Sequence, residues 1–387
     1  ETVVQLFVAR DILAIVATSV AAAGGVCTFC RRRAHSSEQC LQHRRTRFQP
    51  KGTYRRMLKL ASTLEGHEAR VWHAAWSPDG RKIASCGEDK VIRVWEVADP
   101  TVDTPQCKCI STLEEGQSRT IRSCEWSPDG KLIASASFDG SVVVWMAQDK
   151  GFRTWEKIAS LEGHDSEVKS AAWSHDGNFL ATCGRDKKVW VWERLMSGDF
   201  ECVAMLDGHT QDVKFVLWHP SADVLFSCSY DDTVKVWLDD NDEWYCASTI
   251  TGHAGTVWGL GVDATGSRLV SVSADKSAIL WESESPTDPA AGWRRAATVS
   301  NLHDGAIYSA DWSHAHNVVA TGGEDNYIKL CEYSRQGGDG LLQESCAVEA
   351  HEGDVNCVRW NPSTSIASSL LLSCGDDNLV KIWKYTP

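Results

Sequence analysis

The chain has 387 residues, of which 43% are hydrophobic and 24% charged, as in a soluble globular protein. Its formal net charge of -13 argues against a general nucleic-acid binder, because such a protein needs a basic surface to displace counterions. This length allows one large domain or two modest ones.

Residues 1–52 lie outside the pattern that governs the rest of the chain. Because the sequence begins with Glu1, we expect this segment to be a disordered extension or a gene-model artefact. An organellar transit peptide is the next alternative, favoured by many arginines and few acids. A secretory signal is disfavoured because the apolar run at 12–23 lacks a basic cluster at its start. That run is shorter than the roughly 20 residues that span a bilayer, so no membrane attachment is expected.

From residue 64 to the C-terminus, one pattern recurs seven times. In five copies a histidine precedes an aspartate by 22 residues, as His67 precedes Asp89. Six residues after the aspartate stands a tryptophan, such as Trp95, or in one copy Cys331. A fixed spacing with loops of variable length predicts stacked units of one supersecondary type.

Each copy carries the signals of four short β-strands. Ser-Pro-Asp-Gly turns at 77–80 and 127–130 follow a first strand rich in Val, Ala and Trp. Four antiparallel strands in about 45 residues make one propeller blade, so we predict an all-β, seven-bladed propeller over residues 53–387. The last copy lacks its fourth strand. We expect residues 57–62 to supply it, which closes the ring and leaves no open edge.

A polar network is expected to hold each blade together. A Ser or Thr lies four residues before every repeat aspartate, so a chain of hydrogen bonds can run from indole to hydroxyl to imidazole to carboxylate. These sets look like catalytic Ser-His-Asp sites. An enzyme needs one site and not seven, however, so we expect a structural role and no catalysis. The predicted network residues are His67, Ser85, Asp89, Trp95, His164, Thr182, Asp186, Trp192, His209, Ser227, Asp231, Trp237, His253, Ser271, Asp275 and Trp281.

Three copies depart from the pattern. Gln117 replaces the histidine in the second copy, and Cys331 replaces the tryptophan in the sixth. In the seventh, His351 precedes Asp377 by 26 residues, which predicts a longer hairpin at 363–369. We expect these three blades to be less regular than the others.

The 15 cysteines could indicate disulfides or a metal site. Four of them lie three residues before a repeat aspartate, where other copies have small apolar residues, namely Cys86, Cys183, Cys228 and Cys374. An odd total in a domain of this size favours buried free thiols in a reducing compartment. A lone pair at Cys27 and Cys30, and scattered cysteines elsewhere, lack the spacing of zinc ligands. No metal and no cofactor are therefore expected.

Two positions of each copy should lie near the mouth of the channel. One follows the aliphatic residue that opens the first strand, and the other precedes the aspartate. Copies two to four place basic residues there, and copies five, six and one place aromatic ones. Such a surface suits an acidic peptide or a free C-terminus. Equally, the tryptophans could pack the channel and the basic residues be solvated. The candidate partner-binding residues are Arg185, Arg122, Lys169, Lys214, Tyr230, Trp72, Trp258 and Tyr308.

Over residues 56–387 the chain resembles the WD-repeat family of seven-bladed propellers. The stretches 162–173, 181–193, 209–220, 229–237 and 354–362 resemble the WD-repeat subunit, the Ciao or Cia family, of the cytosolic iron–sulfur protein assembly targeting complex. This resemblance implies a non-catalytic docking platform that holds no cluster itself. It also implies a functional role for Arg185, within the motif Arg-Asp-Lys-x-Val-Trp.

The resemblance further implies protein partners. These are a small acidic MIP18-like subunit, a large HEAT-repeat scaffold and client apoproteins that receive iron–sulfur clusters. The expected location is the cytoplasm, with the nucleus as a further possibility. The alternative function is that of a WD-repeat adaptor in another complex, such as a ubiquitin-ligase substrate receptor or a chromatin complex.

Overall fold

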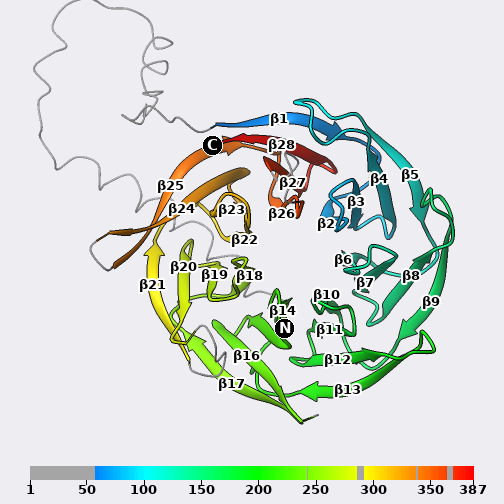
Figure 1. Cartoon of the computed structure of the whole chain (residues 1–387), viewed down its shortest axis with the longest axis horizontal. Helices are drawn as coiled ribbons and strands as arrows, with labels where there is room; N and C mark the ends of the chain where they lie inside the picture. Colours follow the sequence, from blue (N-terminus) through cyan, green and yellow to red (C-terminus); the bar gives the residue numbers. More distant parts are fainter. Residues whose placement is uncertain (1–56, 242, 286–291, 337–338, 364–368) are drawn as a thin grey trace, which may run out of the picture. The chain divides into compact units, whose positions relative to one another are not determined.

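A computed structural model shows four-stranded antiparallel sheets arranged in a ring about a common axis (Figure 1). It describes residues 57–241, 243–285, 292–336, 339–363 and 369–387, which belong to a compact unit that begins at Tyr54. The expected extension at 1–52 lies outside these residues. Within the described part, no helix is long and apolar enough to cross a membrane.

The first four blades follow one another along the chain, each with its first strand nearest the channel. Blade 1 consists of β2 (Val71–Trp76), β3 (Lys82–Gly87), β4 (Ile92–Val97) and β5 (Cys107–Leu113). Blade 2 consists of β6 (Ile121–Trp126), β7 (Leu132–Ser137), β8 (Val142–Ala147) and β9 (Trp155–Leu161). Blade 3 consists of β10 (Val168–Trp173), β11 (Phe179–Gly184), β12 (Val189–Arg194) and β13 (Phe200–Leu206). Blade 4 consists of β14 (Val213–Trp218), β15 (Val224–Ser229), β16 (Thr233–Asp240) and β17 (Glu243–Thr251).

The remaining blades complete the circle and bring both ends of the propeller together. Blade 5 consists of β18 (Val257–Val262), β19 (Arg268–Ser273), β20 (Ala278–Ser283) and β21 (Trp293–Val299). Blade 6 consists of β22 (Ile307–Trp312), β23 (Val318–Gly323), β24 (Tyr327–Gln336) and β25 (Asp339–Glu349). Blade 7 consists of β26 (Val355–Trp360), β27 (Leu370–Gly375), β28 (Val380–Thr386) and the N-terminal β1 (Met57–Leu64). The predicted seven-bladed all-β propeller is confirmed.

The ring is closed by pairing β1 with β28. The two strands run antiparallel from the pair Met57 and Thr386 to the pair Leu64 and Val380. Leu64 is 3% exposed, within the core between blades 7 and 1. The described residues show the predicted closure by an N-terminal strand, which extends two residues further than expected.

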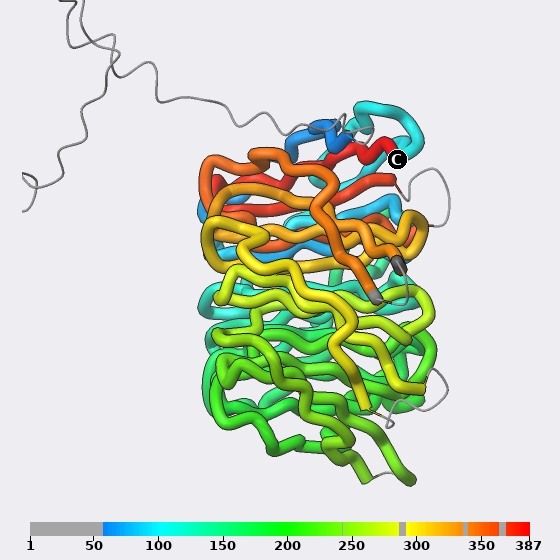
Figure 2. Tube along the Cα trace, turned by 90° about the vertical axis from the view of Figure 1, so that its left-hand side faces the viewer, coloured from blue at the N-terminus to red at the C-terminus, as the bar shows by residue number. Residues whose placement is uncertain are grey.

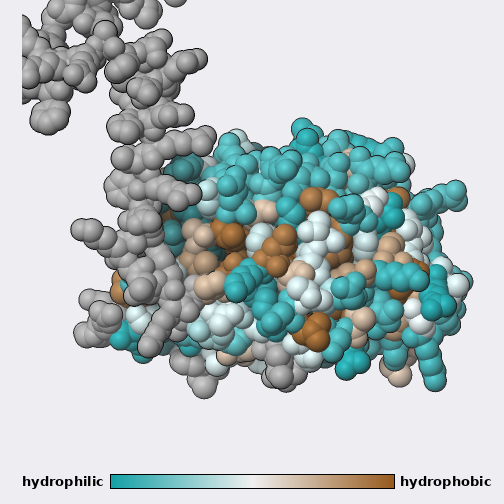
Figure 3. Space-filling model, turned by 90° about the horizontal axis from the view of Figure 1, so that it is seen from above, coloured by the Kyte–Doolittle hydropathy of each residue, from teal (hydrophilic) through white to brown (hydrophobic). Residues whose placement is uncertain are grey.

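The hydrophobic core is divided among the seams between neighbouring blades. The three inner strands of each blade are largely buried, whereas the fourth strand is half exposed on the outer rim. Apolar side chains lie among polar ones on this rim (Figure 3). In the side view, the turns between strands gather on two opposite faces of the ring (Figure 2). These two faces and the rim are the surfaces that a partner can reach.

The sixth blade shows how a departure from the repeat is accommodated. In blade 4, a Cβ atom on Gly208 would lie 2.9 Å from the Trp237 ring, so only glycine fits there. Blade 6 has Leu302 at the glycine position and Cys331 at the tryptophan position. Both are buried in one hydrophobic cluster, so the larger residue compensates for the smaller.

Candidate functional site

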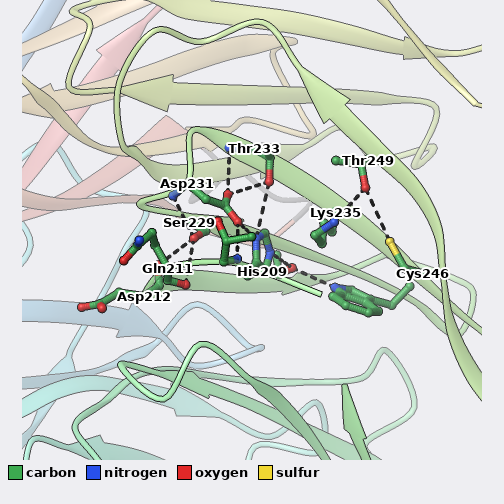
Figure 4. A network of polar contacts seen from close by, with 12 residues as sticks. His209, Gln211, Asp212, Ser229, Asp231, Thr233, Lys235, Cys246 and Thr249 are labelled. Carbon is green, nitrogen blue, oxygen red and sulfur yellow. Dashed lines mark hydrogen bonds and ion pairs between the residues drawn. The ribbon is translucent and has the colours of Figure 1, made fainter. Parts of the chain in front are cut away.

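The repeat histidines are fully engaged within their blades, as blade 4 illustrates (Figure 4). The Trp237 indole N–H donates to the Ser227 hydroxyl at 2.8 Å. Nε2 of His209 lies 2.7 Å from the same hydroxyl, and its Nδ1 lies 2.9 Å from Asp231. Asp231 also accepts hydrogen bonds from Thr233 and from the backbone, which lower its pKa although burial alone would raise it.

Four further blades contain the same four-membered chain of hydrogen bonds. They include blade 7, where His351 still reaches Asp377 at 2.7 Å. The expectation that this blade is less regular is therefore wrong for its network. The longer hairpin predicted at 363–369 is not tested, because residues 364–368 lie outside the described part of the chain. The predicted residues that form these hydrogen-bonded sets are His67, Ser85, Asp89 and Trp95 in blade 1; His164, Thr182, Asp186 and Trp192 in blade 3; and His253, Ser271, Asp275 and Trp281 in blade 5.

Blades 2 and 6 have altered networks. In blade 2 the Ser135 hydroxyl donates to Gln117 at 2.8 Å, and Trp145 lies farther from that hydroxyl, at 3.4 Å. In blade 6, His303 and Thr321 are paired at 2.8 Å, but Cys331 offers no indole N–H. In both blades the hydroxyl is completely buried, as it is in blade 4. In both blades the buried hydroxyl is therefore hydrogen-bonded within its own blade, to Gln117 in blade 2 and to His303 in blade 6.

The cysteines of the described part are all free. The four that precede the repeat aspartates are completely buried, as the repeat pattern predicts. Among the described residues, potential metal ligands come together at His175, Asp176 and Asp223. These three side chains are exposed, and exposed acids commonly cluster without an ion.

The channel mouth is built from seven β-bulges. In every first strand the register shifts directly after the aliphatic residue, as between Val71 and His73 in blade 1. The extra residue is unpaired, and a bulge re-aims its side chain. The bulged residues are Trp72, Arg122, Lys169, Lys214, Trp258, Tyr308 and Asn356. The repeat thus directs one variable side chain per blade towards a common site.

These side chains line a cavity of about 340 Å³. Around the ring the three cations are consecutive, and they contact the aromatic residues at the two ends of their row. Arg122 lies 4.9 Å from the centre of the Trp72 ring, and Lys214 lies 4.9 Å from that of Trp258. Trp258 and Tyr308 meet edge to face at 5.4 Å. Cation–π contacts of this kind hold the cations in place without consuming their hydrogen-bond donors.

Electrostatics divide the cavity into two halves. Burial and the nearby charge of Lys214 lower the pKa of Lys169 to about 8. On the opposite side, burial and the charge of Asp354 raise the pKa of Tyr308 to about 12. Burial together with the charge of Asp376 also raises the pKa of Asp354. One side is therefore suited to an anion, and the other is already acidic.

Two of the predicted residues lie outside the lining of this cavity. The Arg185 side chain is 60% exposed and is held by Glu167, whose carboxylate lies 3.2 Å away. Burial alone would raise the pKa of Glu167, but hydrogen bonds from its backbone, Ser166 and Arg185 lower it to about 2. Tyr230 is 56% exposed, and Lys214 lies 5.2 Å from the centre of its ring.

Sequence reasoning missed the residue two positions before each bulged residue, such as Glu167 before Lys169. In all seven blades, its carbonyl accepts a hydrogen bond from the backbone N–H of the residue before the repeat aspartate. The two side chains are therefore neighbours, which explains the ion pairs of Glu167 with Arg185 and of Arg70 with Glu88. Opposite charges at these two positions were the signal that could have revealed both pairs.

Comparison with known proteins agrees with this architecture. The family described as "WD domain, G-beta repeat" matches residues 58–96, 107–146, 155–193, 200–237, 244–282, 297–332 and 343–384. A "Probable cytosolic iron-sulfur protein assembly protein CIAO1 homolog" of Chlamydomonas reinhardtii is 51% identical, over 84% of this chain and 98% of the relative.

Relatives from animals are similar over nearly the same length. "Probable cytosolic iron-sulfur protein assembly protein Ciao1" of Aedes aegypti is 46% identical, over 85% of this chain and 98% of its own. The CIAO1 homolog of Caenorhabditis elegans is 40% identical, over 82% of this chain and 94% of its own. This chain therefore belongs to the WD-repeat family of cytosolic iron–sulfur protein assembly proteins of the CIAO1 type.

Proposed function

We propose that this protein is a non-catalytic scaffold of the cytosolic iron–sulfur protein assembly machinery. In this role it docks partner subunits, a MIP18-like protein and a HEAT-repeat scaffold, together with client apoproteins that receive clusters. It acts in the cytoplasm and also in the nucleus. The names of its relatives and a propeller with fully engaged histidines support this proposal.

The observation that carries the proposal is the cavity at the channel mouth. Arg122, Lys169 and Lys214 supply three cations within a ring of half-buried aromatic side chains. A carboxylate from a partner would be bound by the cations, and an adjoining aromatic side chain would pack against Trp258 and Tyr308. Such a site recognises an acidic or C-terminal peptide segment and performs no chemistry on it.

Arg185 extends this site onto the exposed face. Its guanidinium is held on one side by Glu167, which also attracts Arg119 at 3.6 Å. A side chain that is oriented in advance loses less conformational freedom when a partner binds. We therefore assign Arg185 to the recognition of a partner's acidic group next to the cavity.

The test is quantitative capture of the partners from cell extract by tagged variants. Lys169→Glu and Arg185→Glu each reverse one charge at the site, and capture should fall about tenfold, the equivalent of one charge-assisted hydrogen bond. Arg81→Glu makes the same change in an exposed turn at the other end of the first blade's strands and should leave capture intact. Unchanged capture by both site variants contradicts the proposal.

A further inference from the structure

A second cavity, of about 580 Å³, lies between blades 5 and 6. It is lined by the beginning of β19, the end of β20, the beginning of β21 and the end of β24, with Arg268, Arg294 and Arg335 among its residues. None of its lining residues belongs to the channel mouth. The proposed function therefore does not account for it.

At this seam, an aromatic contact that occurs in three other blades is replaced. In blades 2, 3 and 4, an aromatic residue of the fourth strand packs against the tryptophan that ends the first strand. The ring centres are 5.8 Å apart for Trp126 and Trp155, and 5.7 Å for Trp218 and Trp244. In blade 6 the register places Leu342 there, and Trp312 contacts Arg268 of blade 5 instead, at 5.7 Å.

The arginines are placed by the register of two sheets. Arg268, Glu282 and Arg294 are direct cross-strand neighbours on β19, β20 and β21. Arg335 reaches the same carboxylate from β24 of the adjoining blade, so Glu282 is clamped between two guanidinium groups. The Glu282 side chain is only 11% exposed, whereas those of Arg294 and Arg335 are 56% and 61% exposed.

Cations outnumber anions in the lining of this cavity. Three guanidinium groups face two carboxylates, Glu282 and Glu284. Arg268 is further paired with Asp263 at 3.1 Å and lies 5.1 Å from the centre of the Tyr333 ring. Each guanidinium has five N–H donors, more than are needed for Glu282 and, in Arg335, for the Tyr333 hydroxyl, so both arginines can bind another carboxylate.

We propose that this cavity binds an acidic peptide segment of a protein partner. Its volume lies within the range of pockets that hold organic ligands and far exceeds that of a single anion. Arg294 and Arg335 bind the carboxylates of the segment, in the way that they already bind Glu282. The ring of Tyr333, which lines the cavity beside Arg268, offers apolar surface to the methylene groups of the segment.

The test is fluorescence anisotropy with a short labelled peptide rich in Asp and Glu and blocked at both ends. Blocking removes the free C-terminus that the channel mouth could recognise. Arg294→Gln and Arg335→Gln should each weaken binding about tenfold, the loss expected for one charge-assisted hydrogen bond. Glu282→Gln removes the competing internal carboxylate and should strengthen binding.

Two matched controls separate this site from the rest of the surface. Arg153→Gln removes one exposed positive charge in blade 2 and should bind like the wild type. Repeating the arginine substitutions in a Lys169→Glu background removes binding at the channel mouth, and the same tenfold losses should remain. Thermal melting checks that each variant is folded. The proposal is overturned if the arginine variants bind normally, or if a peptide with Asn and Gln in place of the acids binds equally well. Displacement by inorganic phosphate at the peptide's own concentration would show simple anion binding and would also overturn it.

Discussion

The polar network makes a quantitative prediction through two isosteric substitutions. Thr182 in blade 3 and Thr321 in blade 6 are both completely buried, and both hydroxyls contact a histidine Nε2, at 2.9 Å and 2.8 Å. The Thr182 hydroxyl also accepts the indole N–H of Trp192 at 3.0 Å. Blade 6 has no tryptophan in that position. Replacement by valine keeps the shape and removes the hydroxyl.

Thr321→Val should leave one buried acceptor on His303 unpaired, whereas Thr182→Val should also leave a buried indole N–H unpaired. Each unpaired buried group costs about 1–3 kcal/mol, so Thr182→Val should lower the free energy of unfolding by about 1–3 kcal/mol more than Thr321→Val. Urea denaturation followed by tryptophan fluorescence measures this difference. Equal destabilisation by the two variants would refute the continuous network.

Three further predictions concern binding and stability. Because the Lys169 pKa is about 8, affinity of the channel mouth for a carboxylate peptide should fall as pH rises through 8, and Lys169→Arg should abolish this fall; titration calorimetry measures both. Leu64→Ala should lower the free energy of unfolding in urea by about 2–5 kcal/mol, because this side chain is buried where the ring closes. Leu60→Ala, at a 51% exposed site of the same strand, should change it little. Equal effects of the two variants would contradict the closure by β1. Burial alone would raise the Asp325 pKa, but its hydrogen bond with His303 lowers it from 3.8 to about 2. Its stabilisation should therefore be complete above pH 3.8 and be lost towards pH 2, and Asp325→Asn should flatten this part of the melting profile against pH.

The repeat spacing predicted the fold because each position that recurs in the repeat has one structural role. The glycine, histidine, hydroxyl and tryptophan positions pack or hydrogen-bond within one blade, so their spacing reports the blade directly. The point at which the last repeat ends also predicted how the ring closes. Because the C-terminal blade lacks a fourth strand, a strand from the N-terminal side was needed to complete it. The residues at the channel mouth could also be located, because the bulge occurs at a fixed place in every first strand.

Side-chain contacts between different segments could not be predicted in the same way. Within blade 3, the pairing of Arg185 with Glu167 depends on a backbone hydrogen bond between the residue before β10 and the turn after β11, which the spacing alone does not reveal. The contacts of Arg122 with Trp72 and of Lys214 with Trp258 depend on side-chain direction across the seams between blades. The arginine cavity depends on the loss of one aromatic contact and on β24, which is longer than the third strands of the other blades.

The central claim is that this propeller is a scaffold of cytosolic iron–sulfur protein assembly. The most direct measurement is affinity purification of the tagged chain from its own cells, followed by mass spectrometry of the proteins that co-purify. We predict recovery of a MIP18-like subunit, a HEAT-repeat scaffold and iron–sulfur apoproteins. Recovery of cullin adaptors or histone factors in their place would contradict the claim.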